Sequence, residues 1–207
     1  MGETTTRRIS TNVKYGLAIH TTSSDLGLAV SNYKGDSRSN VWDLGRSLST
    51  HLHYHLAEYI QPQTWADLGF IAVAKGPGSF TSTRMGVVTA RTLAQQLDIP
   101  LFAISSLEAI ARAEKTDNAI AVQIPAQTNL LYTAIYSSAT ALLPDSLMTV
   151  EVWQNTLEQT SHRLIKAEDS LGATVTSVLE IAYLAWQKGE RPNWIHALPF
   201  YGQSPVS

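Results

Sequence analysis

The alternation of apolar and polar residues near the start of the chain predicts hairpin strands. Apolar positions alternate over 15–19 and again over 26–30, with a hydroxyl-rich turn between them. A Lys-Gly-Asp turn at 34–36 then leads to a possible third strand near Trp42. The fold is therefore expected to open with two or three antiparallel strands.

A change of period at Arg46 predicts the first helix, which Pro62 ends. The continuous apolar run Phe70–Ala74 is typical of a strand buried on both faces, and it leads directly into a glycine loop. A second helix is expected from about Thr83 to Leu97. The order in this part of the chain is therefore strand, glycine loop and helix.

The rest of the chain continues the alternation less regularly. Leu101–Ile104 is expected to form a buried strand, and Ser105 is placed to cap a third helix. Strands are expected at 119–124 and 131–136, followed by a polar stretch and then an amphipathic helix over 175–186.

This order of elements, hairpin strands followed by helix, strand, helix and strand, is typical of a ribonuclease-H-like α/β fold. Such a fold makes up one half of an actin-like ATPase fold. A generic doubly wound sheet gives a similar pattern. We expect two lobes: a flexible polar tail over 1–13, an N-terminal actin-like lobe over 14–116, and a smaller C-terminal lobe over 117–207.

Composition narrows the classes of function. The chain has 207 residues, a formal net charge of -2 and no cysteine, which excludes disulfides, thiolate nucleophiles and cysteine-ligated zinc. Because there is no overall basic field, nucleic-acid contact has to be local or supplied by a partner. No apolar run reaches the roughly 20 residues that span a bilayer. We expect a cytoplasmic protein that does not contact membranes.

The glycine loop is the most informative motif, and it reads Gly76-Pro77-Gly78-Ser79-Phe80-Thr81. Two glycines around a proline allow a sharp turn that exposes backbone N–H groups beside a helix N-terminus, so the loop could cradle an anion. A tight strand-to-helix turn with hydroxyl caps is the simpler interpretation. The loop is not a P-loop, because the Gly-Lys-Ser/Thr ending is missing. A large apolar residue at Phe80 indicates that something else covers the loop.

Small side chains recur every fourth residue in the helix that follows, at Gly86, Ala90 and Ala94. Such a ridge allows another helix to approach closely and is typical of an interface, but packing within the chain explains it equally well. Arg84 and Arg91 lie two turns apart and could flank an acidic partner or be solvated.

These motifs resemble the TsaB (also called YeaZ) family. The resemblance rests on the hexapeptide Gly76–Thr81 with its following Arg-x-Gly, on Leu-Ala-Ile-x-Thr-Thr-Ser from Leu17, on Ile-Ser-x-Leu-Glu from Ile104, and on the Pro-x-Tyr ending at Tyr201. It implies a two-lobed actin-like fold without catalytic activity, docked helix-to-helix on a TsaD-like catalytic subunit. With a TsaE-like ATPase, such a complex uses ATP to place threonylcarbamoyl on adenosine 37 of ANN-decoding tRNAs.

By this resemblance the partner interface and its loop comprise Gly76, Pro77, Gly78, Ser79, Phe80, Thr81, Arg84, Gly86, Ala90 and Ala94. The resemblance also implies tRNA contact through the complex, and we consider a homodimer possible. We predict no catalytic residue in this chain and no cofactor bound by this chain alone.

The chain departs from the family pattern at several positions. An actin-like phosphotransferase needs an Asp at the end of the first strand, where this chain has His20. We therefore interpret His20, Thr21, Thr22 and Ser23 as a vestigial nucleotide loop. Other departures are Ser82 for glycine, Pro125-Ala126-Gln127 for Asp-Ala-Arg, and Gln203 for arginine. They argue against independent ATP hydrolysis.

Three histidines at positions 51, 53 and 55 suggest a metal site, since His51 and His55 lie one helical turn apart. No third ligand is visible, so we predict no metal and favour solvated or interface histidines. Two alternatives to the partner subunit remain: an actin-like small-molecule phosphotransferase or ATPase, and a homodimeric interaction protein that has drifted from the pathway.

Overall fold

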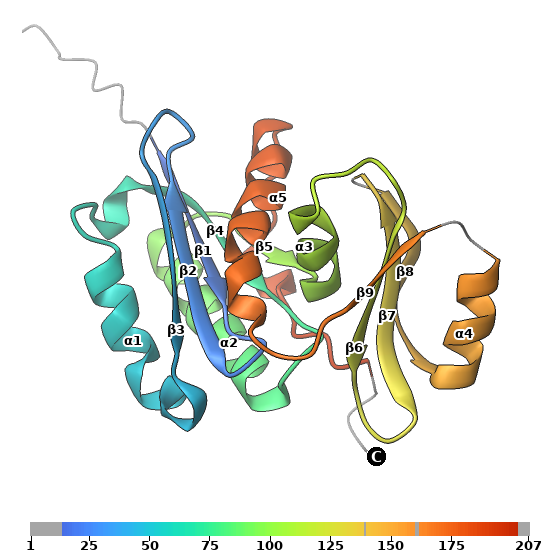
Figure 1. Cartoon of the computed structure of the whole chain (residues 1–207). Helices are drawn as coiled ribbons and strands as arrows, with labels where there is room; N and C mark the ends of the chain where they lie inside the picture. The colour runs from blue at the N-terminus through green and yellow to red at the C-terminus, as the bar shows by residue number, and fades with distance from the viewer. Residues whose placement is uncertain (1–13, 139, 160–161, 203–207) are drawn as a thin grey trace, which may run out of the picture.

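The first sheet has five strands in the order β3-β2-β1-β4-β5. The computed structural model describes residues 14–138, 140–159 and 162–202 (Figure 1). Strands β1 (Tyr15–His20), β2 (Asp25–Ser31) and β3 (Ser37–Asp43) form an antiparallel meander, while β4 (Leu68–Ala74) and β5 (Leu101–Ile104) run parallel to β1. The predicted opening hairpins and the buried strands after them are confirmed.

Helices cover both faces of this sheet. On one face α1 (Leu48–Tyr59) and α2 (Phe80–Leu97) pack over Leu17 and Ile19 of β1. On the other face α5 (Val175–Gln187) packs over Ala18. Because successive side chains of a strand point to opposite faces, alternate residues of β1 enter the two cores.

The second sheet repeats the pattern of the first without a fifth strand. Its order is β8-β7-β6-β9, with an antiparallel meander of β6 (Ile120–Pro125), β7 (Leu130–Ser137) and β8 (Thr140–Thr149), and with β9 (Arg163–Lys166) parallel to β6. Helix α3 (Ser106–Ala113) contacts β6 and β7, and α4 (Val150–Glu158) contacts β7 and β8.

The polar stretch after residue 136 contains three elements that the apolar pattern did not predict. Strand β8 is an edge strand and is mostly exposed or half-buried, so Pro144 is tolerated there and its alternation is weak. Trp153 is the one buried residue of helix α4 (Val150–Glu158). Strand β9 has only four residues. In each element too few positions are buried to create a clear period.

Helix α5 crosses back to the first lobe. It follows the second sheet in the sequence, and the predicted division assigns it to the C-terminal lobe 117–207. In the structure it contacts β1, β2, β4 and α3, and Val178 and Ala182 lie in the core of the first sheet (Figure 1). The first sheet is therefore completed by residues from the end of the chain.

The ridge of small residues on α2 faces the chain's own sheet. Gly86, Ala90 and Ala94 are buried, and α2 contacts β4, β1 and β5 through this side. A Cβ at Gly86 would collide with Oγ1 of Thr21. The prediction that these three residues form a partner interface is wrong, because close packing of α2 on β1 and β4 already uses the ridge.

Within the described ranges, no helix has the length and apolar content required to cross a bilayer.

Candidate functional site

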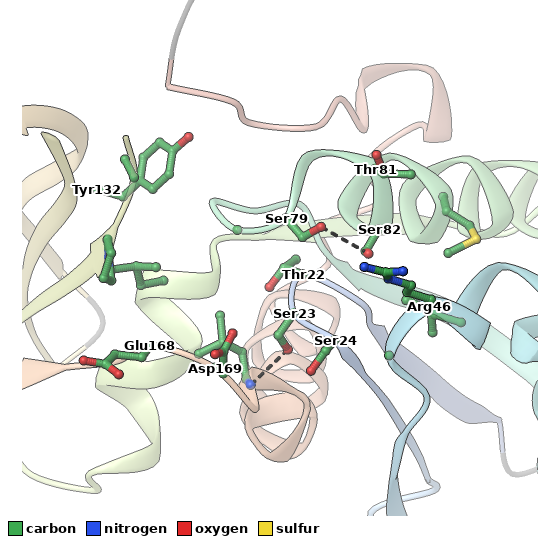
Figure 2. A pocket seen from close by; sticks show the side chains of 18 of the residues that line it. Thr22, Ser23, Ser24, Arg46, Ser79, Thr81, Ser82, Tyr132, Glu168 and Asp169 are labelled. Atoms are coloured by element: carbon green, nitrogen blue, oxygen red, sulfur yellow. Dashed lines mark hydrogen bonds between the residues drawn. The ribbon is translucent and has the colours of Figure 1, made fainter. Parts of the chain in front are cut away.

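A cleft of about 660 Å³ lies between the two lobes. One wall comes from the β1–β2 turn, the segment before α1 and the start of α2, and the other from the ends of β6 and β9 (Figure 2). The first wall is rich in hydroxyl groups, contributed by Thr22, Ser23, Ser24, Ser49, Ser79, Thr81 and Ser82. The cleft can therefore offer many neutral hydrogen-bonding groups to a ligand.

Charged groups on the cleft walls are few. Arg46 lies beside Ser82 on the first wall, and Glu168 and Asp169 lie on the opposite wall (Figure 2). Gln127 and Tyr132 complete the second wall near the end of β6. No lysine is among the described residues that line the cleft. This arrangement could hold a polar ligand, but it supplies little positive charge for a polyphosphate.

The β1–β2 turn places only part of the predicted vestigial nucleotide loop on the cleft. Thr22 and Ser23 line it. Thr21 instead donates its hydroxyl hydrogen to the carbonyl of Ser82, at 2.8 Å. The side chain of His20 is fully buried, and neither ring nitrogen has a hydrogen-bond partner. His20 and Thr21 therefore belong to the core rather than to a ligand surface, and the interpretation of residues 20–23 as a vestigial nucleotide loop stays a prediction.

Burial also fixes the charge of His20. Transfer of an imidazolium into an apolar core is unfavourable, and burial lowers the pKa of His20 from 6.5 to about 3. The residue is thus neutral at neutral pH.

The glycine loop is enclosed by two other segments. Ser79 donates its backbone N–H to the carbonyl of Thr22 at 2.7 Å, and a Cβ at Gly78 would collide with that same oxygen. On the other side Gly76 has a φ of 98° and lies against the carbonyl of Phe200. The glycines therefore serve close packing, and the Ser79 amide that an anion cradle would use is already bonded.

A second set of contacts joins the β1–β2 turn to the chain returning from the second lobe. The buried carboxylate of Asp25 accepts the hydroxyl of Ser23 and, at 3.0 Å, the backbone N–H of Gly172. The hydroxyl oxygen of Ser23 accepts the N–H of Leu171, also at 3.0 Å. These groups cap the start of the short helix η3 (Leu171–Thr174) and close one end of the cleft.

The C-terminal segment 198–202 crosses from the glycine loop to the second sheet, and we call it the strap. Phe200 donates its N–H to the carbonyl of Lys75 at 2.7 Å. The ring centroids of Tyr201 and Phe80 are 4.3 Å apart. The backbone carbonyl of Tyr201 accepts a hydrogen bond from the hydroxyl of Tyr132 at 3.0 Å. Tyr201 thus covers one side of Phe80, which remains 58% exposed.

A separate apolar groove of about 440 Å³ lies between α1 and α2. Its walls are formed by His53, Leu56, Trp65, Met85, Val88, Thr89, Thr92 and Leu93. Val88 is 51% exposed, and Arg84 is exposed on the same side of α2, one turn away. The exposed surface of α2 is thus offset from the buried ridge.

A partly buried polar cluster at the second sheet lies away from the cleft. Tyr136 donates its hydroxyl hydrogen to Asp145 at 2.8 Å, and burial raises the pKa of Tyr136. Burial, and then the nearby Asp145, raise the pKa of Glu108 above its usual range. None of the three residues is among those lining the cleft, so these shifts belong to the junction of α3 with the second sheet.

Several residues of the site were outside the sequence predictions. Arg46 and Tyr132 lie in or beside predicted elements without forming a motif, and Glu168 and Asp169 belong to a polar stretch without a motif. Asp25 ends the hydroxyl-rich turn, and an acid there is the only local signal of its role. Gln203, one of the predicted departures, lies outside the described residues.

Comparison with known proteins places these features in a family. A family model described as TsaD, tRNA N6-adenosine threonylcarbamoyltransferase, matches residues 60–179, which is more than half of the chain. The chain belongs to this family. The match covers the strand β4, the glycine loop, α2 and most of the second lobe.

Two curated relatives carry the name TsaB. The chain is 41% identical over 98 residues to the tRNA threonylcarbamoyladenosine biosynthesis protein TsaB of Bacillus subtilis. The matched segment is 45% of this chain and 43% of that protein. It is 43% identical over 49 residues to TsaB of Buchnera aphidicola, covering 24% and 23% of the two chains. The predicted resemblance to TsaB is confirmed, although the matches span less than half of the length of either relative.

Solved structures support the fold. A Pseudomonas aeruginosa protein described as similar to peptidase YeaZ superposes with a TM-score of 0.75 over 92% of this chain and 100% of its own, at 21% identity. YeaZ from the same organism superposes with a TM-score of 0.69 over 91% of this chain and 99% of its own, also at 21% identity. The predicted α/β fold with two lobes is confirmed, and the two solved structures share it.

Replacement of Asp25 by alanine should destabilise the joint between the lobes. Asp25→Ala leaves the buried N–H of Gly172 and the hydroxyl of Ser23 without their acceptor, so we expect a loss of about 3 kcal/mol in the free energy of unfolding. Chemical denaturation measures it. Asp43→Ala, at an exposed position of β3, is the matched control and should change stability by less than about 0.5 kcal/mol. Equal effects of the two substitutions would contradict the assigned role.

Acid should weaken the fold through His20. In the unfolded chain His20 binds a proton below about pH 6.5, whereas in the folded chain it stays neutral down to about pH 3. The free energy of unfolding is therefore unaffected by His20 above pH 6.5 and decreases as the pH falls from 6.5 toward 3. The expected slope is up to about 1.4 kcal/mol per pH unit. Urea melts at several pH values should show a shallower slope in His20→Leu and an unchanged one in His53→Ala, whose side chain is exposed.

Proposed function

We propose that this chain is a non-catalytic subunit needed for the biosynthesis of threonylcarbamoyladenosine at position 37 of ANN-decoding tRNAs, and that it docks on a TsaD-like catalytic subunit. The names of its TsaB relatives support the pathway. The observation that carries the docking role is the apolar groove between α1 and α2, which lies on the first lobe beside the exposed residues Val88 and Arg84.

The inter-lobe cleft supports a non-catalytic role. The end of β1, where an actin-like phosphotransferase carries its metal-binding carboxylate, holds the buried, neutral His20. The amide of Ser79 is bonded to Thr22 and is unavailable to a phosphate. Glu168 and Asp169 lie on the opposite wall. The hydroxyl of Ser23 donates to the carboxylate of Asp25, but both groups also accept backbone N–H groups of η3, so this pair serves packing in the proposal.

The groove supports helix-to-helix docking of a partner. Its walls are mainly the apolar side chains of Leu56, Trp65, Met85 and Leu93, and they come from α1, α2 and the short helix η2 (Trp65–Asp67). A side chain or helix ridge of a partner would be desolvated there, as the central residues of a stable interface are. In this proposal the partner binds across the exposed side of α2, and the buried ridge only positions that helix.

The remaining parts of the proposal concern the complex. The net charge of -2 gives this chain no field for tRNA, so tRNA is bound through the TsaD-like subunit. A TsaE-like ATPase takes part, and ATP is used by the complex rather than bound by this chain alone. The complex works in the cytoplasm.

Val88→Arg should weaken docking. Val88→Arg places a charge at the groove without disturbing the core, because Val88 is 51% exposed, so affinity for a TsaD-like subunit from the same source should fall at least about tenfold. Calorimetric titration of the two purified chains, and threonylcarbamoyl transfer by the mixture, measure the effect.

The matched control is Val152→Arg, since Val152 is also 51% exposed but lies on α4 of the second lobe. It should leave affinity and transfer unchanged. Wild-type protein that neither binds the TsaD-like subunit nor raises its transfer activity would refute the proposal. If Val88→Arg instead dissociates a homodimer and deletion of the protein leaves tRNA modification intact, the drifted interaction protein is the correct interpretation.

The hydroxyl-lined cleft is the observation that favours the alternative of a phosphotransferase or ATPase. Calorimetry of the isolated chain with ATP and magnesium distinguishes this alternative from the proposed non-catalytic subunit. We expect no tight binding and no turnover, because the cleft offers Arg46 as its only described cation. Micromolar binding with turnover that is lost in Ser79→Ala would establish the enzyme instead.

A further inference from the structure

Two histidines on the outer side of α1 form a pair. His51 and His55 lie one helical turn apart, and their ring centroids are 6.3 Å from each other. His51 is exposed and His55 is half-buried. Two histidines one turn apart lie on the same side of a helix, and this is the spacing at which two imidazoles of one helix bind a single metal ion.

The structure adds a feature that the sequence alone does not contain. Nδ1 of His51 lies 3.0 Å from the carbonyl oxygen of Ser47. A carbonyl only accepts, so Nδ1 carries the hydrogen, and Nε2 is the nitrogen left for a metal ion. This is the hydrogen-bonding pattern of metal-ligating histidines, whose second nitrogen is held by a backbone carbonyl or a carboxylate.

The second imidazole is also held in place. The ring of His55 lies 4.7 Å from that of Trp42 on β3 and 5.6 Å from that of Tyr54. Less side-chain freedom is therefore lost when His55 binds an ion, which favours binding. No carboxylate or third histidine completes the set, since the described residues contain no group of three metal-ligating side chains.

We propose that His51 and His55 chelate one divalent transition-metal ion of the class that prefers imidazole, such as Zn²⁺ or Ni²⁺. The two imidazoles occupy two coordination positions, and water fills the others. The site is separate from the groove, because His53, two residues from each ligand, lies on the opposite side of α1 and lines that groove. Metal binding and partner docking therefore use different faces of one helix, and the proposal does not depend on the function proposed above.

Calorimetric titration of the full chain with Zn²⁺ alone, at about pH 7.5, tests the site. The wild-type chain should bind one ion, and His51→Gln and His55→Gln should each weaken binding at least about tenfold. The matched control is His53→Gln, which removes an exposed imidazole from the same helix and should leave affinity unchanged.

Thermal melts give a second measurement. Zn²⁺ should raise the Tm of the wild-type chain and of His53→Gln but not that of the two pair variants, and chelator should reverse the shift, because an ion that binds only the folded pair stabilises it. Circular dichroism without metal checks that each variant is folded. The proposal is overturned if the wild-type chain does not bind Zn²⁺, or if His53→Gln weakens binding as much as the other two substitutions do. It is also overturned if His51→Gln and His55→Gln bind Zn²⁺ as the wild-type chain does.

Discussion

The hydrogen bond from Ser79 N–H to the carbonyl of Thr22 ties the start of α2 to the β1–β2 turn, and Gly78 lies so close to that carbonyl that no side chain fits between them. The same turn carries Asp25, which holds Gly172 at the return from the second lobe. One short turn therefore positions α2 on one side and η3 on the other. The walls of the cleft, the direction of α2 and the groove beside it all follow from these contacts.

Most of the first lobe could be predicted from the sequence because its elements are buried on well-defined faces. The run Phe70–Ala74 is apolar throughout since helices cover both sides of β4, and Ser105 caps α3 by accepting the N–H groups of Leu107 and Glu108. The second sheet is covered by smaller helices, α3 on one face and the nine-residue α4 on the other. Its edge strand β8 is mostly exposed or half-buried, and the apolar period that reveals a strand is correspondingly weak.

The candidate site was predictable where a residue type is required by the backbone, and not where it depends on distant contacts. Glycines at 76 and 78 indicate a sharp turn, but their contacts with Phe200 and Thr22 come from segments far away in the sequence. The small residues of α2 could not be assigned from spacing, since a ridge facing β1 and a ridge facing a partner have the same period. Asp25 acts on a segment 147 residues away, and no local pattern records such a pairing.

The return of α5 to the first sheet has a consequence for how the chain can be synthesised and divided. One face of β1, β2 and β4 stays uncovered until residues 175–187 have left the ribosome. The first hundred residues can form their hairpins and the α1–α2 side earlier, because those contacts are local, but the opposite apolar face is left in water. A fragment ending at residue 116 would keep that face exposed permanently. The two lobes are thus adjacent in space yet inseparable as folding units.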